Sequence, residues 1–173
     1  MSTFPDKFRL DGRTALVTGS GRGLGWEMAR GLAEAGARVL LHGRSLSRLA
    51  PRLAELRAAG RAADAIAFEM ADRAAMAAAL SATGPIDILV HNVGERDRRP
   101  FVEIAPDDFA RLVDTDLSAG QALIRLVVPG MVERGWGRLI MVTSIAADLA
   151  APGASSYIAA KAGLAALARA LAA

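Results

Sequence analysis

Short apolar runs alternate with helical patterns five times along this chain, and this alternation limits the possible folds more than any other feature. The apolar runs are continuous, as in strands that are buried on both faces. Repeated strand–helix units predict an α/β fold with a parallel sheet, helices on both faces and right-handed crossovers. The expected strands are 15–17, 39–41, 65–68, 86–90 and 139–142, and the expected helices are 24–35, 45–59, 72–80, 106–133 and 155–173.

The composition predicts a single domain over residues 1–173 and excludes several classes of site. The chain has no cysteine and two histidines, His42 and His91, which we expect to be structural, so no metal site is predicted. Its arginines are scattered and it has one tyrosine, which argues against a nucleic-acid partner. Without an opening secretory signal or an apolar run of 18 residues, we expect a cytoplasmic protein with no membrane partner.

A glycine-rich segment follows the first expected strand. Its glycines have the spacing G-x-x-x-G-x-G, which permits a tight turn and lets the backbone approach a pyrophosphate at a helix N-terminus. A flexible loop is the alternative, but the position between a strand and a helix favours dinucleotide binding. The residues predicted to hold the cofactor here are Gly19, Ser20, Arg22, Gly23, Leu24 and Gly25.

The end of the second expected strand bears on the choice of cofactor. An acidic residue usually binds the ribose of NAD at this point, and the chain has none between Val39 and Arg48. Arg22 and Arg44 offer positive charge to a 2′-phosphate instead. We therefore expect NADP(H) to be preferred, with NAD(H) possible, unless both are ordinary surface arginines.

Two further strand ends carry residues that would line a dinucleotide. After the third strand, Glu69 is either an acceptor for the adenine amino group or a solvated carboxylate. After the fourth, an Asn-x-Gly turn lets the backbone pass beside the cofactor, although a plain turn is the alternative. The residues predicted to contact the cofactor at these two ends are Glu69, Met70, Asn92, Val93 and Gly94.

Tyr157 is the only tyrosine and Lys161, four residues later, is one of two lysines. On a helix these positions share a face, and a nearby ammonium favours the phenolate, which suits a general acid/base. An incidental surface pair is the default interpretation. Ser144 ends the fifth expected strand, where it either hydrogen-bonds a substrate carbonyl or caps a turn. Because all five strand ends carry plausible site elements, the catalytic interpretation is favoured.

Together, Thr18-Gly-x-x-x-Gly-x-Gly25, Asn92-x-Gly94, Ser144 and Tyr157-x-x-x-Lys161 resemble the short-chain dehydrogenase/reductase family, most of all its gluconate 5-dehydrogenase-type members. The resemblance implies a Rossmann-like doubly wound sheet, a small-molecule carbonyl or alcohol substrate, and a homotetramer or homodimer. It also implies that Tyr157 and Lys161 contact the cofactor. A 3-oxoacyl-carrier-protein reductase is the nearest alternative within the family.

The resemblance also assigns catalytic roles. Tyr157 would be the general acid/base, Lys161 would lower its pKa and bind the nicotinamide ribose, and Ser144 would orient the substrate oxygen. Asp116 stands where the family usually has an asparagine whose backbone carbonyl anchors a relay water. Asp116 either keeps that role as a fourth catalytic member or pairs with Lys161. The second outcome would leave a non-catalytic NADP-binding scaffold as an alternative function.

Two expectations concern regions beside this site. The segment 95–101 contains three arginines and lies near the substrate mouth of such a fold, where it would suit a carboxylate, unless it is a solvated loop. Family members are longer than this chain, so we expect an incomplete C-terminal part with further strands. The fifth strand would then form an unpaired sheet edge.

Overall fold

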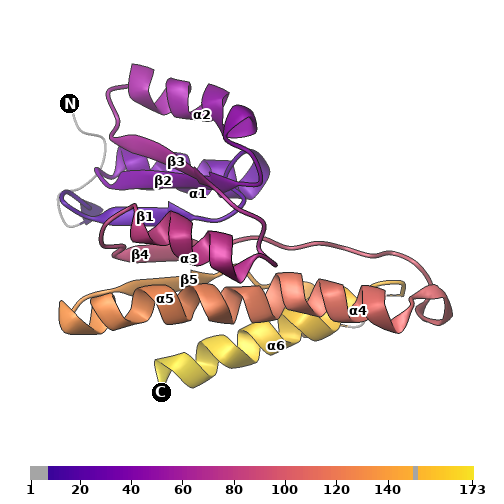
Figure 1. The fold of residues 1–173 in the computed structure, drawn as a ribbon. Coiled ribbons are helices and arrows are strands. Elements are labelled where there is room, and N and C mark those ends of the chain that lie inside the picture. The colour runs from indigo at the N-terminus through magenta and orange to yellow at the C-terminus, as the bar shows by residue number, and fades with distance from the viewer. Residues whose placement is uncertain (1–7, 150–151) are drawn as a thin grey trace.

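The computed structural model describes residues 8–149 and 152–173, so the rest of the predicted domain 1–173 lies outside the described residues. Five parallel strands form one sheet in the order β3-β2-β1-β4-β5, which confirms the predicted parallel α/β fold (Figure 1). The strands are β1 (Thr14–Val17), β2 (Arg38–Gly43), β3 (Ala63–Ala67), β4 (Ile88–His91) and β5 (Arg138–Met141).

Helices cover both faces of the sheet. Alternate strand residues point to opposite faces: Val17 and Leu41 pack with α1 and α2, whereas Leu16 and Leu40 pack with α3 and α5. The last helix, α6, packs against α4 and β5. The helices are α1 (Gly23–Glu34), α2 (Leu46–Ala58), α3 (Arg73–Ser81), α4 (Pro106–Val113), α5 (Ala119–Glu133) and α6 (Ser155–Ala172).

The helix expected over 106–133 is interrupted. A π-helical turn, Asp114–Ser118, separates α4 from α5. Such turns occur mostly as single bulges inside α-helices and often at functional sites. The third strand begins and ends earlier than the expected 65–68, at Ala63–Ala67, while the N–H of Phe68 still donates to the carbonyl of Gly43 (3.2 Å) and its ring is buried in the core.

The order of the strands positions the site. The chain leaves β1 toward β2 on one side and returns to β4 on the other, so the crevice at the carboxyl ends of β1 and β4 is a topological switch point, where ligands bind in such folds. Within the part of the chain that the structure describes, β5 pairs with β4 alone and forms one edge of the sheet.

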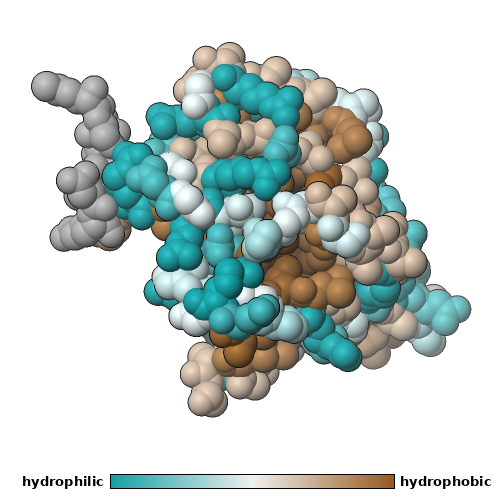
Figure 2. Space-filling view, turned by 60° about the vertical axis from the view of Figure 1, so that its left-hand side comes forward, coloured by the Kyte–Doolittle hydropathy of each residue, from teal (hydrophilic) through white to brown (hydrophobic). Residues whose placement is uncertain are grey.

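The surface mixes polar and apolar areas. In Figure 2 an apolar area lies among hydrophilic side chains on one face of the molecule. The exposed large apolar side chains include Phe101, Val102, Val132 and Ile145. Among the described helices, none combines the length and hydropathy needed to cross a membrane.

Candidate active site

The glycine segment forms a tight turn between β1 and α1. Gly19 and Gly23 have φ angles of +65° and +57°, which L side chains rarely adopt. A Cβ added at Gly25 would lie 2.4 Å from the carbonyl oxygen of Gly19, so the turn closes tightly on the helix. Arg22, the N-cap of α1, makes no side-chain capping bond, and the helix has no acidic residue in its first turn. The first N–H groups of α1 are therefore suited to bind an anion.

The buried ring of His42 supports the glycine turn through a hydrogen bond with the backbone of Gly19. The sequence suggested only a structural role at a strand end, but its ring is buried between the glycine turn and the end of β3. Nδ1 accepts from the backbone N–H of Gly19 (3.3 Å) and Nε2 donates to the carbonyl of Phe68 (3.1 Å). Burial lowers the pKa of His42 to about 4, although the Phe68 hydrogen bond acts in the opposite direction. The imidazole is thus neutral, as both hydrogen bonds require.

Thr18 and Asn92 join the glycine turn to the segment after β4. Thr18 Oγ1 accepts from the backbone N–H groups of Asn92 (2.9 Å) and Val93 (3.2 Å), and Asn92 Nδ2 donates to the carbonyl of Thr18 (3.0 Å). Ser20 Oγ accepts from the N–H of His42 (2.9 Å). The side chains of Ser20 and Asn92 therefore hold the glycine turn in place through hydrogen bonds. The sequence pattern does not single out Thr18 as a site residue, although a hydroxyl side chain at a strand end is a usable signal.

The other predicted cofactor residues divide into exposed and buried ones. Three of them are exposed, close to the carboxyl ends of β1 and β2: Arg22, Leu24 and Arg44. Glu69 is also exposed, and its carboxylate lies 4.0 Å from Nε of Arg44. Met70, by contrast, buries its side chain in the core beneath α3 and α5, so only its backbone remains for a cofactor contact.

Lys161 is buried on α6 and bridges two strand ends. Its Nζ donates to the carbonyls of Val93 (3.1 Å), after β4, and Val142 (3.2 Å), after β5. A Cβ added at Gly94 would lie 2.9 Å from this Nζ, so a larger residue here would require the lysine side chain to shift. Burial lowers the pKa of Lys161, while the charges of Asp116 and Tyr157 counteract that effect.

Tyr157 lies in the first turn of α6, with its ring centroid 5.8 Å from Lys161 Nζ. Burial raises the pKa of the phenol. Hydrogen bonds with Arg96 and Ser144, together with the charges of Lys161 and Arg96, outweigh burial and leave the pKa below its ordinary value. Ser144 Oγ also accepts from the N–H of Ala146 (3.2 Å), so the serine caps a turn as well. The structure thus brings Ser144, Tyr157 and Lys161 together.

Asp116 is buried in the π-helical turn. Its Oδ1 accepts from the N–H of Glu95 (2.8 Å), and its backbone carbonyl lies 3.4 Å from Nε2 of His91. Within the described ranges, no ion pair within 4.0 Å joins Asp116 to Lys161, so the two charges act on each other only at longer range. Burial raises the pKa of Asp116 to about 6, although the Glu95 hydrogen bond and the Lys161 charge lower it.

Arg96 makes a contact that the sequence did not reveal. Its Nη2 donates to the Tyr157 hydroxyl (3.4 Å), and its guanidinium carbon lies 4.6 Å from the centroid of the tyrosine ring. The sequence predicts Arg96 near the substrate mouth but gives no sign of its contact with the phenol. Across residues 8–149 and 152–173 no group of three or more His, Cys, Asp or Glu side chains could hold a metal ion.

A parallel sheet with this strand order and a glycine turn after its first strand is typical of doubly wound α/β proteins. A family model described as short chain dehydrogenase matches residues 13–173. The chain therefore belongs to the short-chain dehydrogenase family.

Individual relatives agree with this assignment. A gluconate 5-dehydrogenase of Gluconobacter oxydans is 38% identical over 165 residues, or 91% of this chain and 63% of the relative. The chain thus spans less than two thirds of the length of that relative. A solved gluconate 5-dehydrogenase of Burkholderia cenocepacia, in complex with NADP and tartrate, is 39% identical with a TM-score of 0.90 over 96% of this chain and 67% of that one. A 3-oxoacyl-carrier-protein reductase of Agrobacterium tumefaciens with NADP bound is 32% identical with a TM-score of 0.92, covering 99% and 68%.

Proposed function

We propose that the protein is an NADP(H)-dependent oxidoreductase that interconverts a secondary alcohol and a ketone by hydride transfer. One observation carries the proposal: Tyr157, in contact with Ser144 and near Lys161, lies at the same sheet edge as the glycine turn. In this proposal Tyr157 is the proton donor and the glycine turn binds the pyrophosphate, on two sides of the crevice at the carboxyl ends of β1 and β4. The alcohol–ketone chemistry of the named relatives supports the same reaction class.

The residues present fit the dinucleotide. The uncapped N-terminus of α1 suits a pyrophosphate, and the positive charges of Arg22 and Arg44 suit a 2′-phosphate. Two of the relatives described above have NADP bound. These points favour NADP(H) over NAD(H), and the proposal assigns Lys161 to the nicotinamide ribose.

The glycine turn, Arg22 and Arg44 would hold NADPH, which would supply the hydride for reduction of the carbonyl carbon. Ser144 holds the carbonyl oxygen, and Tyr157 transfers its phenolic proton to that oxygen. Lys161 stabilises the resulting phenolate, which must recover a proton before the next turnover. The backbone carbonyl of Asp116 is the candidate anchor for a relay water, and the hydrogen bond with His91 fixes its position. Oxidation of the alcohol reverses these steps, with Tyr157 as base.

The substrate that we propose is a sugar acid such as gluconate or 5-ketogluconate. The names of similar proteins support it, as does an arginine at the proton donor. A 3-oxoacyl-carrier-protein substrate is the alternative, supported by the reductase of similar fold. Assembly as a homodimer or homotetramer and a cytoplasmic location remain predictions.

The test is NADPH oxidation across a panel of neutral ketones, keto acids and 3-oxoacyl thioesters, repeated with NADH. We expect turnover that is fastest with a keto acid and NADPH. The Tyr157→Phe variant should lose roughly 10²- to 10⁴-fold in kcat while NADPH binding stays unchanged, because only proton transfer is removed. Tight NADPH binding without turnover of any substrate would instead identify a scaffold protein.

A further inference from the structure

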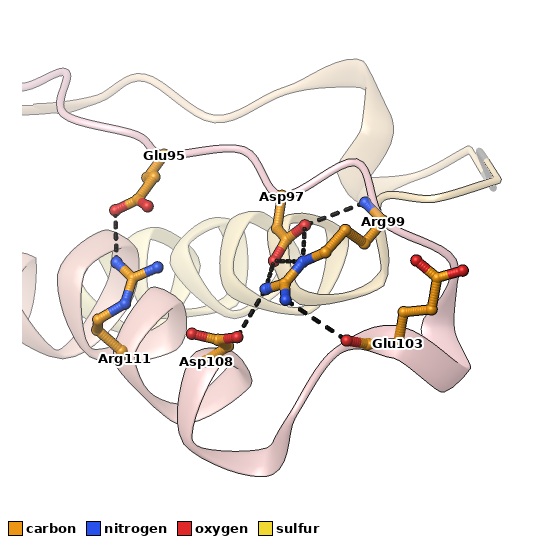
Figure 3. A network of polar contacts seen from close by, with 6 residues as sticks. All are labelled: Glu95, Asp97, Arg99, Glu103, Asp108 and Arg111. Carbon is orange, nitrogen blue, oxygen red and sulfur yellow. Dashed lines mark hydrogen bonds and ion pairs between the residues drawn. The ribbon is translucent and has the colours of Figure 1, made fainter.

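The segment after β4 is fastened to α4 on both sides of Arg96. Glu95 accepts from Arg111 Nη1 (2.8 Å), while Arg99 Nε donates to Asp97 (3.0 Å) and its Nη2 donates to Asp108 (2.7 Å), as Figure 3 shows. Glu95 and Arg99 thus pair directly with α4, and Asp97 pairs with Arg99. The Arg99 guanidinium lowers the pKa of Asp97 to about 2, so this network is charged over a wide pH range.

Arg99 and Arg96 of this segment have different partners. The sequence suggested that three arginines here would suit a carboxylate, but the charge of Arg99 is already matched by Asp97 and Asp108. Arg96 instead extends to the hydroxyl and ring of Tyr157. Because residues on both sides of Arg96 are fastened to α4, its position over the phenol is set by the backbone.

We propose that Arg96 is the specificity-determining residue of this site: its guanidinium, placed at the reacting phenol, binds the carboxylate of an anionic substrate. This role rests on the proposed function for the identity of the reaction. A guanidinium has five N–H donors in a fork that matches a carboxylate. One contact with Tyr157 leaves the others for substrate.

Lys161, the other cation beside Tyr157, is less suited to binding the substrate carboxylate. Lys161 already donates to the carbonyls of Val93 and Val142, so two of its three donors are used. Of the acidic groups in this region, Asp97 is matched by Arg99, Glu95 by Arg111, and Asp116 is buried. Of the two cations at the Tyr157 ring among the described residues, Lys161 is buried and Arg96 is exposed to an incoming anion.

The direct test is binding of tartrate, a hydroxy dicarboxylate, measured by titration calorimetry on the protein and its Arg96→Gln and Arg96→Lys variants. Loss of a charged hydrogen-bond donor should raise Kd roughly 10- to 100-fold in Arg96→Gln, with partial recovery in Arg96→Lys. Arg169→Gln removes an exposed arginine from the last turn of α6 and is the matched control, expected to be unchanged. Equal Kd values for the Arg96 and Arg169 variants would overturn the proposal.

A second measurement uses turnover. In Arg96→Gln, KM for a keto acid should rise by a similar factor while KM for a neutral ketone stays within about twofold. Equal increases for both substrates would mean a structural role and would overturn the proposal. Tartrate binding needs no catalysis, so failure of the proposed function and failure of the Arg96 role are separable. A ¹³C label on tyrosine reports Tyr157 alone in this chain and confirms that the phenol environment changes in the Arg96 variants.

Discussion

Asp116 shows how one side chain can carry a structural bond and an electrostatic cost together. Its Oδ1 anchors the N–H of Glu95 and so helps to hold the segment that carries Arg96. Its second oxygen, Oδ2, is buried without a hydrogen-bond partner among the described atoms. An asparagine would keep the first bond and remove the buried charge.

We therefore predict that Asp116→Asn stabilises the protein at pH 7. Because the folded pKa is about 6 against an ordinary value of 3.8, the ionised carboxylate disfavours the folded state above pH 6. Removing it should increase the free energy of unfolding by about 1–3 kcal/mol. Urea unfolding measures this, and the increase should shrink at pH 4.5, where the folded Asp116 is protonated. The same increase at both pH values would contradict the electrostatic cause.

A second prediction concerns Gly25. In Gly25→Ala the new Cβ would meet the Gly19 carbonyl at 2.4 Å and Asn92 Nδ2 at 2.7 Å, so the turn has to shift. We expect a loss of about 1–3 kcal/mol in unfolding free energy and weaker NADPH binding. Gly31→Ala in the same helix is the control, because its Cβ meets no atom within 4 Å and alanine favours a helix by about 0.5–1 kcal/mol. Equal effects of the two variants would refute the close-contact argument.

At the residue scale, the sequence predicted the residue types that the chemistry needs but not their partners. Spacing placed Tyr157, Lys161 and Ser144 at one sheet edge, as the structure has them. It could not show that Arg96 reaches Tyr157 across 61 positions, or that His42 supports Gly19, because such contacts depend on how separate loops pack. Met70 was a cofactor candidate from its position alone, whereas burial turned its side chain into the core.

At the scale of elements, the ion pairs between the segment 95–99 and α4 hold position more than they stabilise the fold. Exposed ion pairs contribute about 0.2–1 kcal/mol each. Asp108→Asn should therefore change the unfolding free energy by less than about 1 kcal/mol, but it should accelerate amide hydrogen exchange in 95–99, because Arg99 loses its partner on α4.

The neighbouring Asp107 supplies the control for this prediction. Both aspartates lie in the first turn of α4, so Asp107→Asn removes the same favourable charge from the helix N-terminus without touching the Arg99 pair. Hydrogen exchange followed by mass spectrometry should show faster exchange in 95–99 for Asp108→Asn only. Unchanged exchange in both variants would mean that the segment is held by other contacts.

The order and type of the elements were predictable because apolar runs and helical periods alternate so regularly. The π-helical turn was not, since 106–133 reads as one amphipathic helix and Pro106 marks only its start. Whether a helix takes one extra residue in a turn is decided by packing of the segments on either side, which a local pattern does not contain.

The whole molecule should lose stability in mild acid because two histidines are buried and neutral. The folded pKa values of His42 and His91 are about 4 against an ordinary value of 6.5. As pH falls through 6.5, the unfolded chain takes up protons that the folded protein refuses until about pH 4. Asp116 acts in the opposite direction between about pH 6 and 3.8, because the folded state holds its proton more tightly.

Summing these three groups predicts a loss of about 3 kcal/mol in unfolding free energy between pH 7 and pH 4.5. Urea unfolding at several pH values measures it. The Asp116→Asn variant should lose about 5 kcal/mol over the same range, because the compensating carboxyl is gone. A pH-independent free energy in the wild-type protein would show that the histidines are not held neutral.

The π-helical turn at 114–118 also makes the chain tolerant of a change in length at one point. A π turn spans one residue more per hydrogen bond than an α-helical turn. Deleting one amino acid there would restore an unbroken α-helix and leave α5 close to its present rotation about the helix axis. A deletion near the start of α5 would instead rotate the following residues by about 100°, and Val127 and Met131, now packed on the sheet, would turn away from it. A deletion scan should therefore find single deletions at 114–118 less destabilising than single deletions near the start of α5.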